Sequence, residues 1–396
     1  MSTDSAWLVL GGLHHLNGVQ PPASTDALVL ARLNEPLHGH FPSNTVVLRF
    51  PDLGALELRG RSGQVASVDG ARLFDHMLAG PELSALTAGS PAPVVPLFYL
   101  SVREADGRTL VHVHSQIRFC LEDACFIRTS PQPIEVSDVR DLSWLAEAVA
   151  RHAEGFLFLG NHQRYYQKCF PGKELEYKYT LQPPADIWSL TVRLYQRLRA
   201  GSLPGYLMEY RDEFQAWDYV NHLYQVTAPV PDRGYVSFIP TTDGKNLVKR
   251  KWFTQDTFSR RESHTYGVVP AAGYDDYLRT ELGVSATKLP SFRRVRYDVN
   301  FESARTGHVY GIFFDHVSLL EQPSVMLSQC ELEYLRSRTI LQPSEEDVLA
   351  EIADIAVWLE AFLREQGLAD ERGYYSKLSF LLDAVAARPA LASEVR

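Results

Sequence analysis

The sequence predicts an α+β protein with two domains. Three observations predict this class: short alternating strands in the first 160 residues, charged alternating strands further along, and two amphipathic helices beside them. The chain has 396 residues, of which 45% are hydrophobic and 22% charged. This composition is typical of globular proteins, and the length is sufficient for two hydrophobic cores.

The charge of the chain changes near its middle. Residues 1–160 contain 11 arginines and no lysine against 17 acidic residues, whereas residues 161–340 contain 23 basic against 20 acidic residues. Such a shift indicates a boundary near residues 155–170. We therefore expect a β-rich N-terminal domain of unknown role over 1–160 and a second domain over 166–390.

Short strands with turns dominate the N-terminal region. Pro, Gly, Asp and Ser separate segments that alternate or are rich in β-branched residues, which is typical of strands. The predicted strands are Val46–Phe50, Ala55–Arg59, Leu97–Val102 and Thr109–Phe119. A helix is expected over Leu142–Glu154. His112 and His114 share one strand face. Paired histidines on a strand are more often surface residues than metal ligands when no third ligand is in view, so we expect both at the surface.

Two helices are predicted in the second region from the spacing of their apolar residues. Asp186–Ala200 and Glu345–Gln366 both repeat apolar side chains at helical intervals. Ser344 is a suitable N-cap for the second helix, and Gly367 follows its end. A long loop is expected over Gly273–Ser291. Because both helices are amphipathic, we expect each to cover a sheet or a barrel.

Four segments of the second region alternate charged with apolar residues. A strand has a period of two, so the charged side chains of each segment project to one face. In order along the chain they are Glu174, Glu176 and Lys178; Lys249 and Lys251; Arg294 and Arg296; and Glu331 and Glu333. Solvated strand faces have the same pattern. If the faces instead converge, they line a polar interior in which cations bind a polyphosphate and carboxylates bind Mg²⁺ or a similar ion.

The segment Glu174–Lys178 resembles the ExExK signature of the CYTH family, also called triphosphate tunnel metalloenzymes. Members include class IV adenylyl cyclases, thiamine triphosphatases and inorganic tripolyphosphatases. The order of the later charged segments is similar to the family's, and the resemblance covers about residues 168–385. It implies an antiparallel β-barrel tunnel of about eight strands with flanking helices.

The resemblance also implies roles for individual residues. Phosphate-binding candidates are Lys178, Lys249, Lys251, Arg260, Arg294, Arg296 and Lys377. Candidates for binding one or two Mg²⁺ or Mn²⁺ ions are Glu174, Glu176, Asp315, Glu331 and Glu333. Glu176, Lys178 and Glu333 are the catalytic candidates. The segment Arg260–Glu262 is either tunnel wall or a solvated strand edge.

The expected activity is metal-dependent hydrolysis of an inorganic or organic triphosphate. A cyclase that makes a cyclic nucleotide and pyrophosphate is the alternative, and a sensor that binds polyphosphate or nucleotide without turnover is a third possibility. The pair Lys249 and Lys251 replaces the family's usual arginines, which affects the expected substrate more than the fold. The aromatic stretch Tyr206–Tyr224 is expected in the core, and it is where the organic part of a substrate would be sought.

Composition limits the partners and the compartment. The formal net charge of -9 argues against nucleic acid as a partner, and no uncharged run has the composition of a membrane helix. Four cysteines without a zinc-like spacing predict a reducing compartment, the cytoplasm. A triphosphate-containing small molecule is the expected ligand, and residues 1–160 are available for a protein partner.

Overall fold

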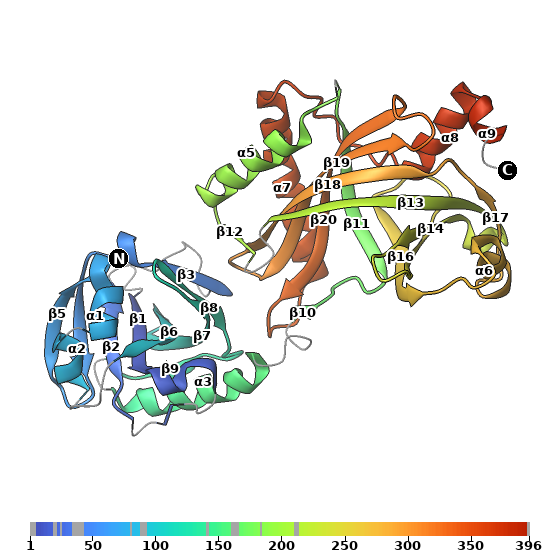
Figure 1. The fold of residues 1–396 in the computed structure, drawn as a ribbon. Coiled ribbons are helices and arrows are strands. Elements are labelled where there is room, and N and C mark those ends of the chain that lie inside the picture. The colour runs from blue at the N-terminus through green and yellow to red at the C-terminus, as the bar shows by residue number, and fades with distance from the viewer. Residues whose placement is uncertain are drawn as a thin grey trace. The chain divides into compact units, whose positions relative to one another are not determined.

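The chain forms two compact units (Figure 1). The computed structural model describes residues 5–18, 22–23, 26–33, 43–79, 81–87, 93–139, 142–159, 166–182, 184–209 and 214–393. The first unit comprises residues 1–167 with the short segments 303–307 and 337–343, and the second comprises the remaining residues. No helix of the described residues is long and apolar enough to cross a membrane.

A nine-stranded antiparallel sheet forms the first unit as far as it is described. Its strands are β1 (Ser5–Gly12), β2 (Val29–Leu33), β3 (Thr45–Arg49), β4 (Ala55–Gly60), β5 (Val65–Asp69), β6 (Val94–Ala105), β7 (Arg108–Phe119), β8 (Asp123–Arg128) and β9 (Ile134–Val136). They follow the order β3-β8-β7-β6-β1-β2-β4-β5, and β9 pairs with β7. The four strands predicted in this region are confirmed, except that Phe50 begins a short 3-10 turn.

Around β1, both faces of this sheet are apolar. Alternate residues of β1 enter two different cores: Leu8 packs with α1 (Leu73–Ala79) and α2 (Pro81–Leu86), whereas Val9 packs with α3 (Leu145–Leu159). The predicted helix over Leu142–Glu154 is therefore confirmed as a 3-10 turn followed by α3. A strand buried on both sides places every side chain in a core.

The expectation that His112 and His114 lie at the surface is wrong. Both are buried, with relative exposures of 5% and 0%. Nε2 of His114 lies 2.7 Å from the carbonyl oxygen of Ser43, and Nδ1 of His152 on α3 lies 2.8 Å from Oγ of Ser115. The strand pattern did not reveal this burial because both faces of β7 are covered.

The second unit contains a closed antiparallel barrel of eight strands. Around the barrel the strands are β18 (Phe292–Ser303), β19 (His308–Leu319), β20 (Met326–Arg338), β11 (Lys173–Thr180), β16 (Ser259–Val268), β15 (Asn246–Trp252), β14 (Gly234–Pro240) and β13 (Phe214–Ala228). Pairing of β13 with β18 closes the ring. The α+β class and the eight-stranded barrel predicted above are both confirmed.

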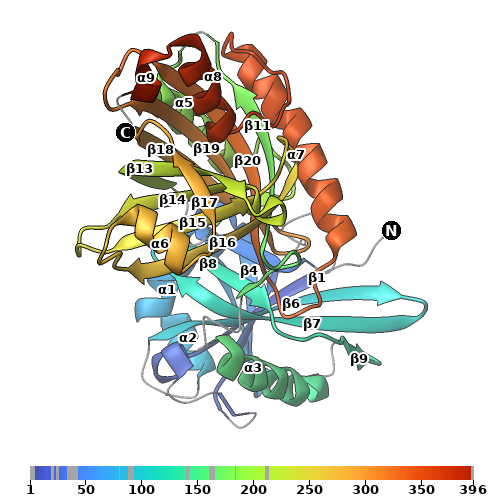
Figure 2. The same cartoon turned by 90° about the vertical axis from the view of Figure 1, so that its right-hand side faces the viewer.

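Helices cover the apolar outer face of this barrel (Figure 2). The helices α5 (Ile187–Arg199) and α7 (Glu345–Glu365) occupy the predicted segments. Oγ of Ser344 accepts a hydrogen bond from the backbone of Asp347 at 3.1 Å, as its N-cap position predicts. Leu194 of α5 and Ile355 of α7 share a core with Leu332 of β20. Cys330 is fully buried in this core.

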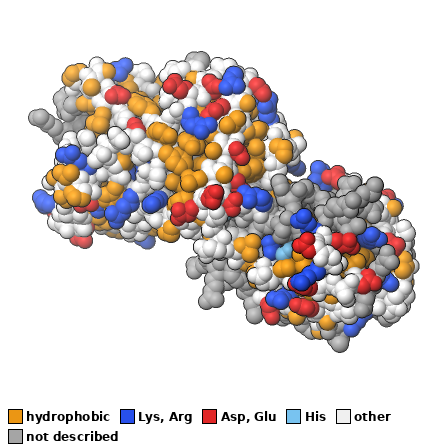
Figure 3. All heavy atoms as spheres, turned by 180° about the vertical axis from the view of Figure 1, so that it is seen from behind, with side chains coloured by type: hydrophobic (Ala, Val, Ile, Leu, Met, Phe, Trp, Pro, Cys, Tyr) orange, Lys and Arg blue, Asp and Glu red, His pale blue; other side chains and the backbone are white. Residues whose placement is uncertain are grey.

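Smaller elements of the second unit include β12 (Tyr206–Met208), α9 (Ala390–Ser393) and three others. The region 273–291, which we expected to be a loop, contains α6 (Tyr274–Thr280) and β17 (Ser285–Lys288). Leu278 and Val284 anchor them to the barrel core around Phe238, which explains why the segment is ordered. The helix α8 (Lys377–Ala387) packs beside Val317 and Leu327. Hydrophobic side chains also gather on the face of this unit that Figure 3 shows.

Candidate functional site

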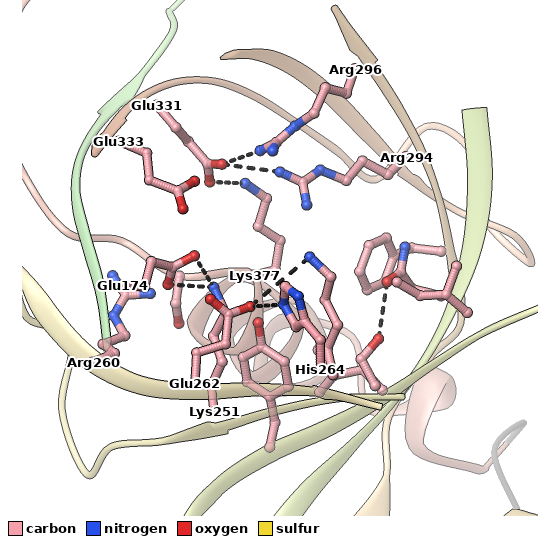
Figure 4. A pocket seen from close by; sticks show the side chains of 18 of the residues that line it. Glu174, Lys251, Arg260, Glu262, His264, Arg294, Arg296, Glu331, Glu333 and Lys377 are labelled. Carbon is pink, nitrogen blue, oxygen red and sulfur yellow. Dashed lines mark hydrogen bonds and ion pairs between the residues drawn. The ribbon is translucent and has the colours of Figure 1, made fainter. Parts of the chain in front are cut away.

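The inward faces of the barrel strands line a polar cavity of about 650 Å³, open solvent at its mouth included. We call the cavity the lumen. Its charged side chains come from six strands and from the start of α8, and Figure 4 shows most of them. They are the cations Lys178, Lys249, Lys251, Arg260, Arg294, Arg296 and Lys377, and the carboxylates Glu174, Glu176, Glu262, Asp315, Glu331 and Glu333.

Strand periodicity places these side chains as the sequence predicts. Glu174, Glu176 and Lys178 of β11 point inward, while Leu175 and Tyr179 pack in the outer core. All the predicted site residues lie in or beside the lumen. They do not form one mixed cluster, however, because five of the six carboxylates divide into two groups with different neighbours. The sixth, Glu262, contacts His264.

The first group is a carboxylate triplet of Glu174, Glu176 and Glu333. One oxygen from each lies within 4.8 Å of the others, which is close enough to ligate a single ion. The triplet forms because Glu176 and Glu333 are directly opposite each other in the β11–β20 pairing. Three carboxylates suit Mg²⁺ or Mn²⁺, which prefer oxygen ligands. These residues therefore fit a divalent cation.

Electrostatics within the triplet favour a bound cation as well. Burial raises the pKa of Glu333 well above its ordinary value, and the negative charges of Glu174, Glu176 and Glu262 raise it further. Among the described residues, no cation lies within ion-pair distance of Glu333. The negative charges of the other two glutamates each have a cationic neighbour. Nζ of Lys251 lies 2.6 Å from Oε1 of Glu174, and Nη1 of Arg260 lies 2.8 Å from Oε1 of Glu176.

The second group comprises Asp315 and Glu331, and cations surround both. Nε of Arg296 donates to Oδ1 of Asp315 at 2.7 Å, and Nη2 of Arg294 lies 3.0 Å from Oε2 of Glu331. Nζ of Lys377 contacts Asp315 at 2.7 Å and also contacts Glu331. We call these two carboxylates, together with the surrounding Arg294, Arg296 and Lys377, the cation cluster. Asp315 and Glu331, which the resemblance implies are metal ligands, are thus engaged by basic side chains.

The pKa of Glu331, in the cation cluster, shifts in the opposite direction to that of Glu333. Burial alone would raise the pKa of Glu331, but Lys178, Lys377 and Arg296 hold it well below its ordinary value. Burial disfavours the charge of Lys178, yet Glu176 and Glu331 hold its pKa above the ordinary value. Nζ of Lys178 lies 3.0 Å from Glu176 and 2.6 Å from Glu331, so this lysine joins the two groups.

Two cations of the lumen retain hydrogen-bonding capacity for a ligand. Nε of Arg294 is buried and has no hydrogen-bond partner among the described residues. The nearest ion pair of Lys249, to Glu262, is long at 4.0 Å. Since buried donors are normally satisfied, an orphan guanidinium donor in a cavity indicates a missing acceptor. Phosphate oxygens are acceptors of this kind.

The start of α8 delivers Lys377 to the lumen. Oγ of Ser376 caps the helix by accepting from the backbone of Ser379 at 3.1 Å. A carboxylate oxygen of Asp256 accepts from the Ser376 backbone at 3.1 Å and from Oγ of Ser379 at 2.7 Å. Nζ of Lys377 is thereby held 2.7 Å from Oε1 of Gln329, to which it donates a hydrogen bond.

Among the lumen residues that were not predicted as site residues are two titratable side chains of β16. Glu262 and His264 follow Arg260 at intervals of two along β16, and all three line the cavity. Arg261 points outward, with its guanidinium 4.3 Å from the ring centre of Trp252. The segment is therefore tunnel wall. Extending the period of two from Arg260 would have found both residues.

Comparison with known proteins adds little to this picture. No family model and no curated protein matches the chain. One similar solved structure is a candidate adenylyl cyclase from Hippeastrum, described as having a dominant triphosphatase activity. It is 14% identical, covers 54% of this chain and 95% of its own, and has a TM-score of 0.28.

A second similar structure is the di-domain ARO/CYC StfQ from the steffimycin biosynthetic pathway. It is 10% identical, covers 91% of this chain and 89% of its own, and has a TM-score of 0.15. Neither TM-score is high enough to be evidence for an activity in this chain.

Proposed function

We propose that the barrel is a triphosphate tunnel of the CYTH type and that it hydrolyses a triphosphate with the help of Mg²⁺ or Mn²⁺. The observation that carries the proposal is the division of the lumen into a carboxylate triplet and a cation cluster. A divalent ion balances the first, and a polyanion balances the second. Polyphosphate bound to a divalent cation supplies both charges in one ligand.

The charge balance of the lumen supports this ligand class. Seven cationic side chains accompany six carboxylates, so the formal charges of the lumen side chains nearly cancel. A divalent ion bound to the triplet would leave about three positive charges, which is close to the charge of a bound triphosphate. A polyanion alone would meet the triplet, in which Glu333 has no cationic partner among the described residues, and a metal ion alone would leave the cations in excess.

The cations would bind and orient the phosphates. Arg294 offers its free Nε, and an arginine with five donors can hold Asp315 or Glu331 and a phosphate oxygen together. Lys249 would bind an outer phosphate as a point charge. The metal would be held by Glu174, Glu176 and Glu333, and it would supply charge neutralisation at the phosphate oxygens.

Hydrolysis needs positioning more than covalent chemistry. The oxygen of a water molecule attacks the terminal phosphorus, the bond to the bridging oxygen breaks, and diphosphate leaves. A carboxylate of the triplet accepts the proton of the attacking water. Lys178, between the triplet and the cation cluster, stabilises the charge that develops on the transferred group.

Orthophosphate release tests the proposal. Inorganic tripolyphosphate, ATP and thiamine triphosphate are each incubated with Mg²⁺ or Mn²⁺, and the products are analysed by mass. We expect release that EDTA abolishes and that Glu333→Gln reduces by roughly 100-fold. Glu321→Gln, the same change at an exposed position, is the matched control and retains activity.

Two other outcomes would replace the proposal. Pyrophosphate with a cyclic nucleotide would identify a cyclase. Metal-dependent binding of triphosphates without turnover would identify a sensor. Orthophosphate release that continues undiminished in Glu333→Gln would remove the triplet from the mechanism.

A further inference from the structure

One tryptophan of the barrel is unusually exposed for its position. Half of Trp217, on β13, is accessible to solvent. Large aromatic side chains are on average mostly buried. Trp217 also lies on the inward face of its strand, because it shares a period of two with Asn221, which lines the lumen. An inward-facing and exposed side chain lies at an opening of the barrel.

The pairing of β13 shows where this opening is. Residues 214–221 pair with β18, whereas residues 222–226 pair with β14. Among the described strands, the first half of β13 therefore has a neighbour on one side only. We call residues 214–221 the lip of the barrel. Trp217 is in the middle of the lip.

The ring of Trp217 is held in a defined orientation. Its Nε1 donates to Oδ1 of Asp298 at 3.1 Å. Asp298 is only 1% exposed, and its other oxygen accepts from Nδ2 of Asn300 at 3.3 Å. A hydrogen bond to a buried and fixed carboxyl group leaves the indole little freedom to rotate, so its exposed surface is preorganised.

Trp217 also adjoins the cations that we assign to phosphate binding. It is directly opposite Arg296 in the β13–β18 register, and directly opposite side chains lie on the same face about 5 Å apart at Cβ. The guanidinium of Arg296 contacts Asp315 in the cation cluster. A ligand whose phosphates reach Arg296 would thus place its remaining part near the indole.

We propose that Trp217 is a stacking platform for a planar aromatic ring attached to the triphosphate, as in a nucleoside triphosphate or thiamine triphosphate. The inference rests on the proposed function and narrows it to organic triphosphates. Stacking on an aromatic side chain tolerates different rings because each has a π-face. Arg296 and the triplet then act on the phosphates, and Trp217 acts on the organic part alone.

The experiment compares organic with inorganic ligands. Calorimetry in Mg²⁺ measures the affinity for the β,γ-imido analogues of ATP and thiamine triphosphate and for imidotriphosphate, and kcat/KM is measured with the corresponding substrates. The variants are Trp217→Ala and Trp217→Phe. Trp188→Ala is the matched control, because Trp188 is 51% exposed but lies on α5 and packs against Phe214 and Tyr297.

We expect Trp217→Ala to weaken binding of at least one organic analogue by roughly 5- to 150-fold while imidotriphosphate binds as before. Trp217→Phe should retain most of the affinity, and Trp188→Ala should change nothing. Loss for one organic analogue only would identify which ring the platform takes. Equal weakening of all three ligands by Trp217→Ala, or no change in any, would overturn the inference.

These outcomes are distinct from failure of the proposed function. A wild-type protein that binds the analogues but releases no orthophosphate would refute the hydrolase, and the ratio of organic to inorganic affinity would still decide the role of Trp217. A wild-type protein that binds none of the three ligands would overturn both proposals.

Discussion

The N-terminal sheet and the barrel are both antiparallel, but they differ in what their second face contains. In the sheet, Leu8 and Val9 enter two apolar cores, each covered by helices. In the barrel, the outer face is apolar, and the inner face carries the charges of the lumen. Closure gives a sheet an interior that needs no helix to cover it.

The comparison shows why the barrel charges are evidence for function. Buried ion pairs seldom stabilise a fold more than apolar packing of the same size does, because desolvation offsets their attraction. Around β1, the N-terminal sheet has apolar side chains on both faces. The barrel instead retains thirteen charged lumen residues, and a ligand explains them better than stability does.

The largest expected effect distinguishes two glutamates on one strand. Glu331→Gln leaves Lys178, Arg296 and Lys377 without their shared carboxylate, so we expect the barrel to lose about 3–5 kcal/mol of unfolding free energy. Glu333→Gln removes repulsion within the triplet and should leave the metal-free barrel as stable or more stable. Urea unfolding in EDTA measures both, and equal destabilisation by the two variants would contradict the division of the lumen.

Acid should affect the N-terminal unit before the barrel. Burial lowers the pKa of His114 and of His152 to about 4 from 6.5 in the unfolded chain. Because the unfolded chain binds protons first as the pH falls, stability present above pH 6.5 is lost progressively toward pH 4. At pH 5 the loss is about 2 kcal/mol for each histidine, or about 4 kcal/mol for the two.

In the barrel, the pKa of Glu331 is below its ordinary value of 4.5. The contribution of its ionised carboxylate to the stability of the barrel is therefore lost only below that pH. Calorimetry at pH 7 and pH 5 should therefore show the transition of the N-terminal unit moving to lower temperature by more than that of the barrel. His152→Gln should reduce the movement. A larger shift of the barrel transition would contradict this account.

Metal should stabilise the barrel and leave the N-terminal unit unaffected. At a free concentration one hundred times its dissociation constant, Mg²⁺ or Mn²⁺ adds about 2.7 kcal/mol to the unfolding free energy of the unit that binds it. We expect a rise in the barrel Tm that EDTA reverses and that Glu333→Gln abolishes. A rise that persists in Glu333→Gln would place the ion elsewhere.

The smallest expected effect is on the outside of the barrel. Ser344→Ala removes the N-cap of α7 and should cost about 1 kcal/mol. Because the cap lies away from the lumen, the loss should be the same with and without metal, and affinity for triphosphates should not change. A change in affinity would show that α7 is coupled to the lumen.

Much of the barrel could be predicted from local sequence. The period of two in Glu174–Lys178 identified the inward face of β11, and helical spacing located α5 and α7. These patterns succeed because one face is apolar and the other polar. The same reasoning failed for His112 and His114, since a strand covered on both sides shows no polar face.

The sequence by itself determined which charged residues of each strand share a face, because side-chain direction along a strand alternates with a period of two. Only the tertiary structure decided what each of them does there. Glu331 and Glu333 share a strand and a face, yet the register places Glu331 opposite Lys178 and Glu333 opposite Glu176. The charge on the neighbouring strand gives Glu331 a lowered and Glu333 a raised pKa, and that neighbour is set by the register of β11 against β20.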